Sequence, residues 1–333
     1  MAAVRPEKIR NVALVGHAGA GKTSLVDALL FTAGAIGRLG RVEDGTTVTD
    51  FEPEEQKRCQ SLSLSMAPVH WKGHKINLLD APGYADFEHE AIVALRIADL
   101  AVFVVSAVEG VEVQTERLWK VAAELSLPRM VFVNKLDRER SSFPRTLDQL
   151  RELFGAGIAP LELPIGQEAE FCGIADLLTD TAYRYAGGQA TTGEIPDHME
   201  ALEHEVHDNL VEGIVVADDA QLERYLEGDV VSVAELERTL AIGVDRAQVF
   251  PVVCGSATAD IAIDRLADFI CEIGPSPLDR PPVDVVAGDT TIGITPDPTA
   301  EPLAFVFKTI ADPYGQISVM KVLSGTIRAD DHL

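Results

Sequence analysis

The sequence is short of cysteine and of positive charge, and each shortage excludes a class of protein. Its four cysteines are scattered, and no two stand at the spacing of a metal-binding pair, so we expect no zinc site. Lysine and arginine number 28 against 53 aspartates and glutamates, which gives a formal net charge of -25. A surface this negative repels nucleic acid unless basic residues cluster locally, so we expect no direct sequence-specific contact with nucleic acid.

The sequence also has no apolar run long enough to span a bilayer. The longest, Leu100 to Val108, fits a buried strand, whereas a membrane helix needs about 20 apolar residues. The N-terminal segment MAAVRPEKIR contains no apolar stretch of signal-peptide length, so export is not expected. We therefore expect a cytoplasmic protein without membrane attachment, and a monomer.

What is present is an alternation of strand-like and helix-like segments. Through the first half, apolar runs such as Asn11 to Gly16 and Met130 to Asn134 alternate with amphipathic segments such as Lys22 to Phe31. This rhythm is typical of an α/β fold, in which helices cover both faces of a mostly parallel sheet. The rhythm lapses near Gly157 and returns at residues 248–254, so the residues between them look inserted.

These patterns divide the chain into four parts. The α/β domain, with a six-stranded sheet, covers residues 8–157 and 246–285, and an inserted α+β subdomain covers residues 158–245. A proline-rich linker follows at residues 286–301, and residues 302–333 hold two strand-like runs. Two strands cannot bury a core of their own, so we expect the start of an unfinished domain, poorly packed and with an open strand edge.

The clearest chemical signal is the segment GHAGAGKT, Gly16 to Thr23, which lies between a strand and a helix. It fits the P-loop pattern G-x-x-x-x-G-K-[ST], in which backbone N–H groups and the helix N-terminus surround a phosphate. Lys22 is expected to reach the β- and γ-phosphates, and the Thr23 hydroxyl is expected to ligate Mg²⁺.

A second strand end supplies the other half of the phosphate site. Asp80 closes an apolar strand in DAPGY, where its carboxylate can hold Mg²⁺ and the Gly83 N–H can bind a γ-phosphate. DxxG alone is a weak signal, but it becomes a strong one at a strand end downstream of a P-loop. The predicted phosphate-binding residues are Gly16, His17, Ala18, Gly19, Ala20, Gly21, Lys22, Thr23, Ser24, Asp80, Ala81, Pro82, Gly83 and Tyr84.

The base is indicated by NKLD, Asn134 to Asp137, which follows another apolar strand. An ionised Asp137 can accept from guanine N1–H and the 2-amino group together, and adenine offers no such pair of donors. Asn134 can tie this loop to the P-loop, the Lys135 stem can lie along the base, and a backbone N–H after the last strand can meet guanine O6. The predicted guanine-binding residues are Asn134, Lys135, Leu136, Asp137, Ser256 and Ala257.

With these residues located, the chain resembles the translational GTPases, and among them elongation factor G. The similar segments run nearly end to end: GHAGAGKT, DAPGYADF, NKLDR, VVCGSA, PSPLDRPPV and FKTIADPYGQISVMKVLSGTI. The resemblance implies a P-loop GTPase domain, a G′-like insertion at residues 158–245 and the first strands of a β-barrel second domain. That family has five domains, so the chain corresponds to an N-terminal portion of it. The resemblance further implies hydrolysis of GTP to GDP and phosphate, Mg²⁺ as cofactor, and the ribosome as partner in elongation or translocation.

Two departures from the family's pattern lie beside the metal and the P-loop. Ser61 stands for the threonine that ligates Mg²⁺ in the GTP state, and the hydroxyl survives that change. Gly19 stands where the P-loop of the family often has an aspartate, proposed to hold a monovalent cation. The expected metal ligands are therefore Thr23, Ser61 and Asp80.

Further departures concern the attacking water. The family's histidine after DxxG is Tyr84 here, and Gln60 replaces an apolar residue of a gate whose other side is Ala18. A tyrosine can hydrogen-bond a water but cannot become a cation at neutral pH as a histidine can. We therefore expect slow hydrolysis without the ribosome, and a paralogue of elongation factor G rather than the housekeeping factor. The candidate catalytic residues are Lys22, Gly83 and Tyr84.

The sequence leaves other functions open. A second interpretation is a nucleotide-gated switch that docks on ribosomes with weak intrinsic GTP hydrolysis. Ribosomal-protection proteins and class II release factors also fit the resemblance, because they differ mainly in domains outside this chain. A P-loop kinase or ATPase is disfavoured by Asp137 and by the lack of a lid-like arginine cluster.

We predict that the chain binds GTP and GDP and discriminates strongly against ATP. Adenine would leave the Asp137 carboxylate desolvated and unpaired, and penalties of that kind reach roughly 10⁴-fold. Isothermal titration with GTP and with ATP in one buffer measures the ratio, and GDP serves as the positive control. An ATP affinity equal to that for GTP would contradict the guanine assignment.

Overall fold

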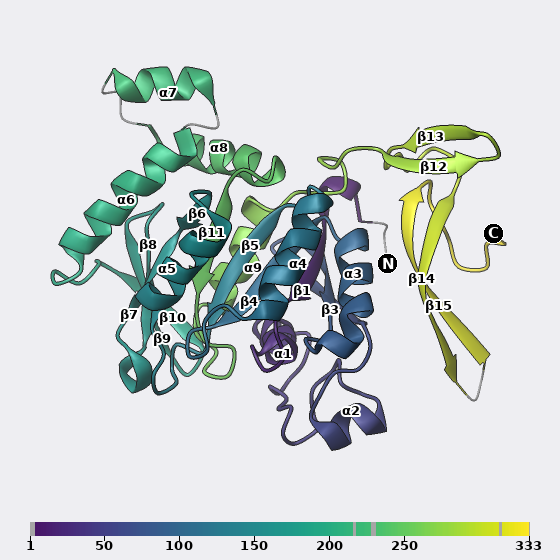
Figure 1. Cartoon of the computed structure of the whole chain (residues 1–333), viewed down its shortest axis with the longest axis horizontal. Helices are drawn as coiled ribbons and strands as arrows, with labels where there is room; N and C mark the ends of the chain where they lie inside the picture. The colour runs from purple at the N-terminus through teal and green to yellow at the C-terminus, as the bar shows by residue number, and fades with distance from the viewer. Residues whose placement is uncertain (1–3, 216–217, 228–230, 313–314, 333) are drawn as a thin grey trace.

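A seven-stranded sheet forms the centre of the computed structural model, which describes residues 4–215, 218–227, 231–312 and 315–332 (Figure 1). The strand order is β2-β3-β1-β4-β5-β11-β6, and every neighbouring pair is parallel except β2 with β3. The strands are β1 (Ile9–Val15), β2 (Ser65–Trp71), β3 (His74–Asp80), β4 (Leu100–Ser106), β5 (Arg129–Asn134), β6 (Ile158–Pro160) and β11 (Phe250–Cys254). The α/β fold and the antiparallel edge strand agree with the sequence pattern.

The predicted number of six strands was wrong, because β6 adds a seventh. It pairs in parallel with β11, with Ile158 opposite Phe250, and so belongs to the main sheet although the sequence analysis assigned it to the insertion. With three residues it is too short for a hydrophobic period to be visible in the sequence.

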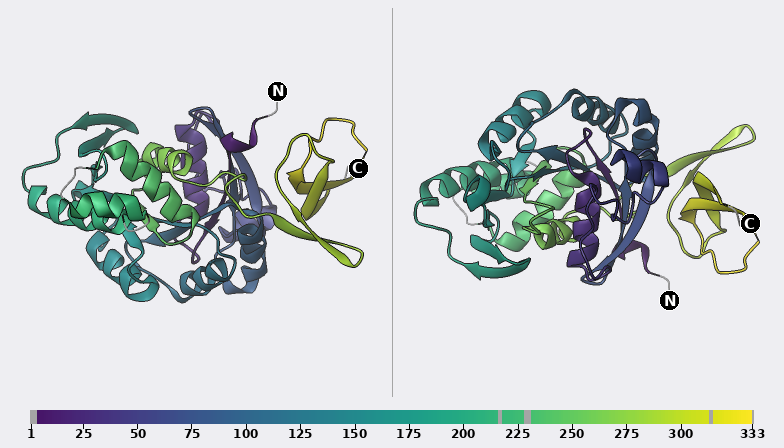
Figure 2. Two further views of the ribbon diagram at one scale, coloured as in Figure 1. Left: turned by 90° about the horizontal axis from the view of Figure 1, so that it is seen from above. Right: turned by 90° about the horizontal axis from the view of Figure 1, so that it is seen from below.

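Helices cover both faces of this sheet (Figure 2). On one face lie α1 (Lys22–Thr32) and α9 (Ile263–Glu272), and on the other lie α3 (Glu88–Ile97), α4 (Val113–Glu124) and α5 (Phe143–Phe154). Shorter elements are α2 (Pro53–Arg58) and the 3-10 helices η1 (Pro6–Lys8), η2 (Ala85–Phe87) and η3 (Glu168–Glu170). Every residue of β4 and β5 is buried, which is why these strands read as unbroken apolar runs rather than as alternating ones.

The parallel arrangement determines where the candidate site lies. Because β1, β3, β4, β5 and β11 run the same way, their carboxyl ends meet at one edge of the sheet. The loops after these strands are the ones that carry the predicted motifs. Ligands of open α/β sheets bind at this edge.

A second, antiparallel sheet of order β10-β9-β8-β7 lies in the chain between β6 and β11 of the main sheet. Its strands are β7 (Glu162–Ile165), β8 (Gly173–Asp176), β9 (Thr181–Ala186) and β10 (Gln189–Gly193), and the helices after them are α6 (Glu200–Val215), α7 (Asp219–Leu226) and α8 (Val233–Asp245). This agrees with the α+β character predicted for the insertion; residues 216–217 and 228–230 of that segment lie outside the described residues.

Buried charges join the second sheet to the main domain. Arg265 of α9 donates to Asp176 of β8 at 2.6 Å and to Asp268 of its own helix at 2.7 Å. Glu162 of β7 is fully buried, and its Oε2 accepts from the Cys254 N–H of β11 at 2.8 Å. Burial raises the pKa of Glu162 to about 8, so this side chain is mostly protonated at neutral pH.

Two hairpins complete the chain: β12 (Val283–Ala287) with β13 (Thr290–Ile294), and β14 (Leu303–Asp312) with β15 (Gly315–Ser324). The first hairpin corrects part of the linker predicted at residues 286–301, because residues 286–294 belong to it and residues 295–301 contain no helix or strand. Its β-branched residues flank a two-residue turn at Gly288 and Asp289. The prolines around this segment led to the prediction of a linker, whereas a two-residue turn between β-branched runs is typical of a β-hairpin.

The β14–β15 hairpin forms a two-stranded sheet with much exposed apolar surface, although Phe307 packs against the main core. Its exposed apolar residues are Phe305, Val306, Ile317, Met320 and Val322. Residues 313–314 and 333 of the predicted β-barrel segment lie outside the described residues, and its continuation into a barrel stays a prediction. Across the described ranges, no helix combines the length and apolarity needed to cross a membrane.

Candidate nucleotide-binding site

The P-loop joins β1 to α1 as its sequence predicts, and glycine is required where the loop enters the helix. Gly21, which directly precedes Lys22, has φ 96°, a left-handed conformation that side-chain-bearing residues rarely adopt. A Cβ on Gly21 would also run into the side-chain amide of Asn134. Glycine is therefore needed here both for the turn and for the close approach of the loop Asn134 to Asp137, which is called the base loop below.

The Lys22 ammonium lies at the centre of the loop. Nζ donates to the carbonyl oxygens of Gly16 at 3.0 Å and His17 at 2.7 Å, and the side chain is buried. Burial lowers the pKa of Lys22 to about 8, although nearby Asp80 and Asp50 favour its charged form. It remains mostly cationic at neutral pH, which suits the phosphate-binding role predicted for it.

Gly83 of the second motif packs directly against this lysine. A Cβ there would clash with Lys22 Nζ and would lie 2.6 Å from the Ala18 backbone nitrogen. The structure thus packs Gly83 against Lys22 and Ala18 so closely that only glycine fits at position 83.

Asp80 lies buried beside the P-loop with one of its oxygens free. Its Oδ2 accepts from Thr49 Oγ1 at 2.6 Å, whereas Oδ1 is buried and has no hydrogen-bond partner among the described residues. Burial raises the pKa of Asp80 to about 6, and hydrogen bonds from Thr49 and Thr23 together with the Lys22 charge oppose that rise. A buried carboxylate with an unpaired oxygen gains most from a cation.

The two predicted hydroxyl ligands meet beside this carboxylate. Thr23 Oγ1 and Ser61 Oγ lie 3.1 Å apart, and Ser61 donates to Asp50 Oδ1 at 2.7 Å. Hydroxyl and carboxylate oxygens are the donors that Mg²⁺ prefers, so Thr23, Ser61 and Asp80 fit that ion. Within the described ranges, no group of three or more histidine, cysteine or acidic side chains is arranged to hold a metal.

Sequence reasoning missed the acidic residues that hold the loop between α1 and β2. Asp50 is buried and accepts from Ser61, and Asp27 of α1 accepts from the N–H groups of Gly40 at 3.0 Å and Val48 at 2.9 Å. Neither residue belongs to a sequence motif. Their partners lie 11 to 21 residues away, so only the folded loop identifies them.

Asn134 joins the base loop to its neighbours, as expected. Its Nδ2 donates to the Ala20 carbonyl at 2.9 Å, and its Oδ1 accepts from the Ala257 N–H at 3.0 Å. The Ser256 hydroxyl donates to Asp137 Oδ1 at 2.6 Å and so holds one oxygen of the carboxylate. The other oxygen, Oδ2, lies 3.6 Å from Arg138 Nε and is available to a ligand. The Leu136 side chain is buried under the loop.

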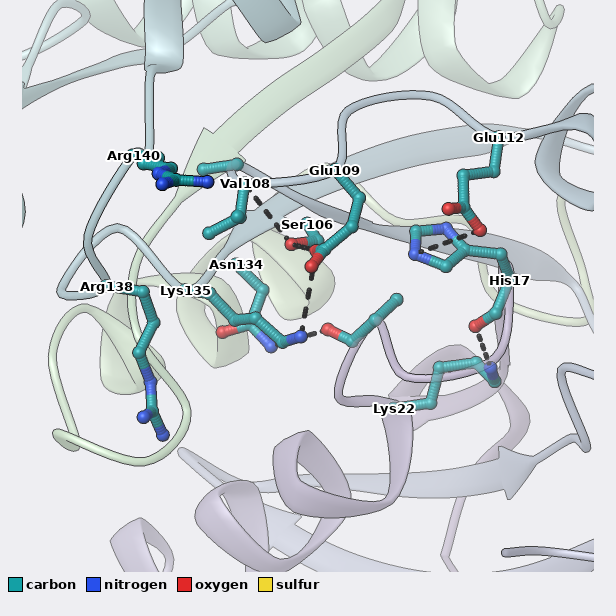
Figure 3. Close-up of polar contacts among 12 residues, drawn as sticks. His17, Lys22, Ser106, Val108, Glu109, Glu112, Asn134, Lys135, Arg138 and Arg140 are labelled. Carbon is teal, nitrogen blue, oxygen red and sulfur yellow. Dashed lines mark hydrogen bonds and ion pairs between the residues drawn. The ribbon is translucent and has the colours of Figure 1, made fainter.

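Glu109 was missed, although it follows a strand of the same sheet edge. It accepts a hydrogen bond from Ser106 at the end of β4, and its Oε2 lies 3.8 Å from Lys135 Nζ (Figure 3). Lys135 has φ 66°, so the loop turns sharply at this residue. The strand-end rule that found the other loops applies to β4 as well and could have indicated Glu109.

His17 is the buried histidine of the P-loop. Its Nε2 lies 3.6 Å from Glu112 Oε2, which Figure 3 shows reaching down from the start of α4. Burial, and after it the nearby Lys22 charge, lower the pKa of His17 to about 4, so the ring is neutral at pH 7. His17 therefore adds no charge to the phosphate site.

The Tyr84 side chain takes no part in the hydrogen bonds that join other predicted site residues. Its side chain is 48% exposed, and its hydroxyl makes no hydrogen bond within the described part of the chain. Gln60 lies at the end of α2, where its N–H donates to the Glu55 carbonyl at 3.0 Å. The phosphate and base residues are thus connected through side chains, and the residues expected to place the water are not.

Comparison with known proteins relates this geometry to a family. The model of the elongation factor Tu GTP-binding domain matches residues 7–276. An elongation factor G-like protein of Thermotoga maritima is 36% identical over 327 residues, which are 98% of this chain and 47% of that protein. A crystal structure of a protein from Thermus thermophilus superposes with a TM-score of 0.86 at 38% identity, again over 98% of this chain and 47% of the other. The chain spans about half the length of these relatives.

We predict that Ser256→Ala weakens GDP binding about tenfold. The lost hydrogen bond ends on a carboxylate, and such bonds contribute about 1.5 kcal/mol, so Asp137 would lose its orientation before guanine arrives. Titration calorimetry of the variant measures the change. Thr258→Ala is the matched control in the same loop, because its hydroxyl lies 3.5 Å from Ser256 Oγ and does not contact Asp137. Equal affinities for the two variants would show that Ser256 does not orient the carboxylate.

Proposed function

The chain belongs to the family of the elongation factor Tu GTP-binding domain, among the translational GTPases, and from this we propose that it binds GTP at the P-loop edge of its sheet, hydrolyses it to GDP and phosphate, and couples that cycle to the ribosome. The observation that carries the proposal is the Asn134 bridge. One amide connects the loop of the proposed phosphate residues to the loop of the proposed guanine residues, so base and phosphates would be held at a fixed separation.

Each part of the proposed site has its own task. Lys22 and the P-loop N–H groups neutralise and surround the phosphates, and Asp137 accepts from guanine. The Gly83 N–H would donate a hydrogen bond to the γ-phosphate, because this residue is packed against Lys22. Mg²⁺ bound by Thr23, Ser61 and Asp80 would supply further positive charge to the phosphate oxygens.

Hydrolysis needs an attacking water, and Tyr84 is the residue that we propose to place it. Its exposed ring has room to turn toward the γ-phosphate, and its hydroxyl can orient a water without carrying a positive charge. Because the Tyr84 hydroxyl makes no hydrogen bond within the described residues, we propose that a partner positions its side chain. We propose that this partner is the ribosome, in elongation, translocation or a related step.

The same observation favours a second candidate function. If the ribosome does not position Tyr84, the chain acts as a nucleotide-gated ribosome-binding switch, or as part of a ribosomal-protection protein, with slow hydrolysis. Both candidates use GTP, GDP and Mg²⁺, and both place a monomeric protein in the cytoplasm.

We predict that ribosomes stimulate phosphate release by the natural full-length protein. Stimulation by 10³-fold or more would agree with partners that complete the active sites of P-loop GTPases, where factors of roughly 10³–10⁵ are typical. Steady-state phosphate release with and without ribosomes measures it, and translocation is assayed beside it. Tight GTP-dependent ribosome binding without stimulation would favour the switch.

A further prediction concerns Tyr84→His. An imidazole can both place the water and carry positive charge, so ribosome-dependent hydrolysis should stay equal or rise, by up to about 100-fold. Single-turnover hydrolysis with saturating ribosomes measures the rate, and Tyr84→Phe is the control that removes the hydroxyl alone. A large fall in the histidine variant would mean that the tyrosine itself is required for catalysis.

A further inference from the structure

Ser61 begins a short segment, residues 61–64, that connects the helix α2 with the strand β2. Its hydroxyl lies at the proposed metal site, 3.1 Å from Thr23 Oγ1 and 2.7 Å from Asp50 Oδ1. The position of this segment therefore decides whether the hydroxyls that would ligate Mg²⁺ come together.

Two glutamates hold the backbone of the same segment. Glu55 of α2 accepts from the N–H groups of Leu62 at 2.9 Å and Ser63 at 3.3 Å. Glu90 of α3 accepts from the Leu64 N–H at 2.7 Å. Because α3 follows the Asp80–Tyr84 motif in the chain, Leu64 connects the two loops that flank the proposed γ-phosphate position.

The C-terminal hairpin makes a third contact with residues 61–64. Lys308 of β14 donates from Nζ to Ser63 Oγ at 3.0 Å and to the Leu64 carbonyl oxygen. The backbone of Leu64 is thus held at its N–H by α3 and at its C=O by β14. Lys308 lies beyond residue 276, where the match to the GTP-binding domain ends.

A β-bulge brings Lys308 to this position. Val306 pairs with Met320 and Lys308 pairs with Val319, so the intervening Phe307 has no partner on β15. If the pairing after Val306 were regular, Phe307 would lie opposite Val319 and Lys308 opposite Ser318, and Lys308 would point to the other face of the hairpin because side chains alternate along a strand. Phe307 itself packs against the main core, which fixes the bulged part of the hairpin on the domain.

A second lysine anchors the same face of the hairpin at a different place. Lys321 of β15 donates to the Ile97 carbonyl at 2.8 Å and to Asp99 Oδ1 at 2.9 Å, at the far end of α3 (Figure 1). Neither acceptor belongs to a loop of the proposed nucleotide site. Among the described residues, Lys308 and Lys321 thus make similar docking contacts, and of these two the contact made by Lys308 reaches residues 61–64.

We propose that Lys308 is a positioning residue for the nucleotide site, which couples the placement of the β14–β15 hairpin to the gathering of Ser61 and Thr23. The inference rests on the proposed function and names a regulation of the same site. A contact that stabilises residues 61–64 in the arrangement with Ser61 at the metal position favours GTP over GDP, because only GTP carries the γ-phosphate beside it. By linkage, GTP stabilises the docked hairpin by the same factor.

The test compares Lys308→Met with Lys321→Met in the 333-residue chain. Both substitutions keep an unbranched apolar stem and remove one ammonium from the same face of the hairpin. Titration calorimetry with GDP and with a non-hydrolysable GTP analogue, at one Mg²⁺ concentration, gives the ratio of the two affinities. We expect Lys308→Met to lower the preference for the GTP analogue by about fivefold, the lower end of common allosteric couplings, and Lys321→Met to leave it unchanged.

Hydrogen exchange provides a readout independent of nucleotide. The amides of residues 62–65 should exchange faster in Lys308→Met than in the parent or in Lys321→Met. Ser63→Ala removes one Lys308 acceptor without changing the hairpin, so it should shift the affinity ratio in the same direction and by less. This variant also keeps the test decisive if Lys308→Met folds poorly.

The outcomes separate the inference from the function on which it rests. An unchanged ratio in Lys308→Met, or an equal shift in Lys321→Met, would overturn the coupling, since the hairpin would then act only as a docked domain. If the parent chain binds neither nucleotide, the proposed function fails instead.

Discussion

The two hydrogen bonds of the Asn134 side chain are the interaction on which the candidate site depends. They connect three loops that follow three different strands, through the Ala20 carbonyl and the Ala257 N–H. The parallel sheet brings those loops to one edge, but a sheet alone leaves the ends of its loops free to move apart. One buried amide, satisfied at both ends, turns separate loops into a single surface, and Gly21 is needed for it to approach the P-loop.

Around this amide the structure collects charges that a nucleotide would balance. Lys22, Asp80 and Asp50 are all buried close to one another. Burial lowers the pKa of Lys22 and raises the pKa of Asp80 and of Asp50, so it favours the neutral form of each side chain. Such an arrangement is costly in isolation, because desolvated charges need partners. Phosphates and a divalent cation supply partners of the right sign, which is the physical reason to interpret the cluster as a binding site rather than as a structural one.

Agreement between sequence and structure was best where the signal was local. The mainly apolar strands β1, β4 and β5, of six or seven residues each, and the glycine-rich loop follow from short-range chemistry, and the structure has them where expected. The failures have equally physical causes. Strand β6 is too short to show a period, the prolines around β12 and β13 concealed a two-residue turn, and Asp27 and Asp50 act through folded loops rather than through motifs. Glu109 could have been found, because it follows a strand of the same edge.

The sequence by itself determined the nucleotide motifs, since the residues of a P-loop, DAPGY or NKLD function within a few positions of one another at the end of a strand. Only the tertiary structure decided how these motifs are held and to what they are connected. Lys308 and Leu64 are 244 residues apart, and their hydrogen bond exists because a bulge turns the lysine toward the domain on which the hairpin docks. Contacts of that kind depend on the mutual placement of whole elements, which no local pattern of residues encodes.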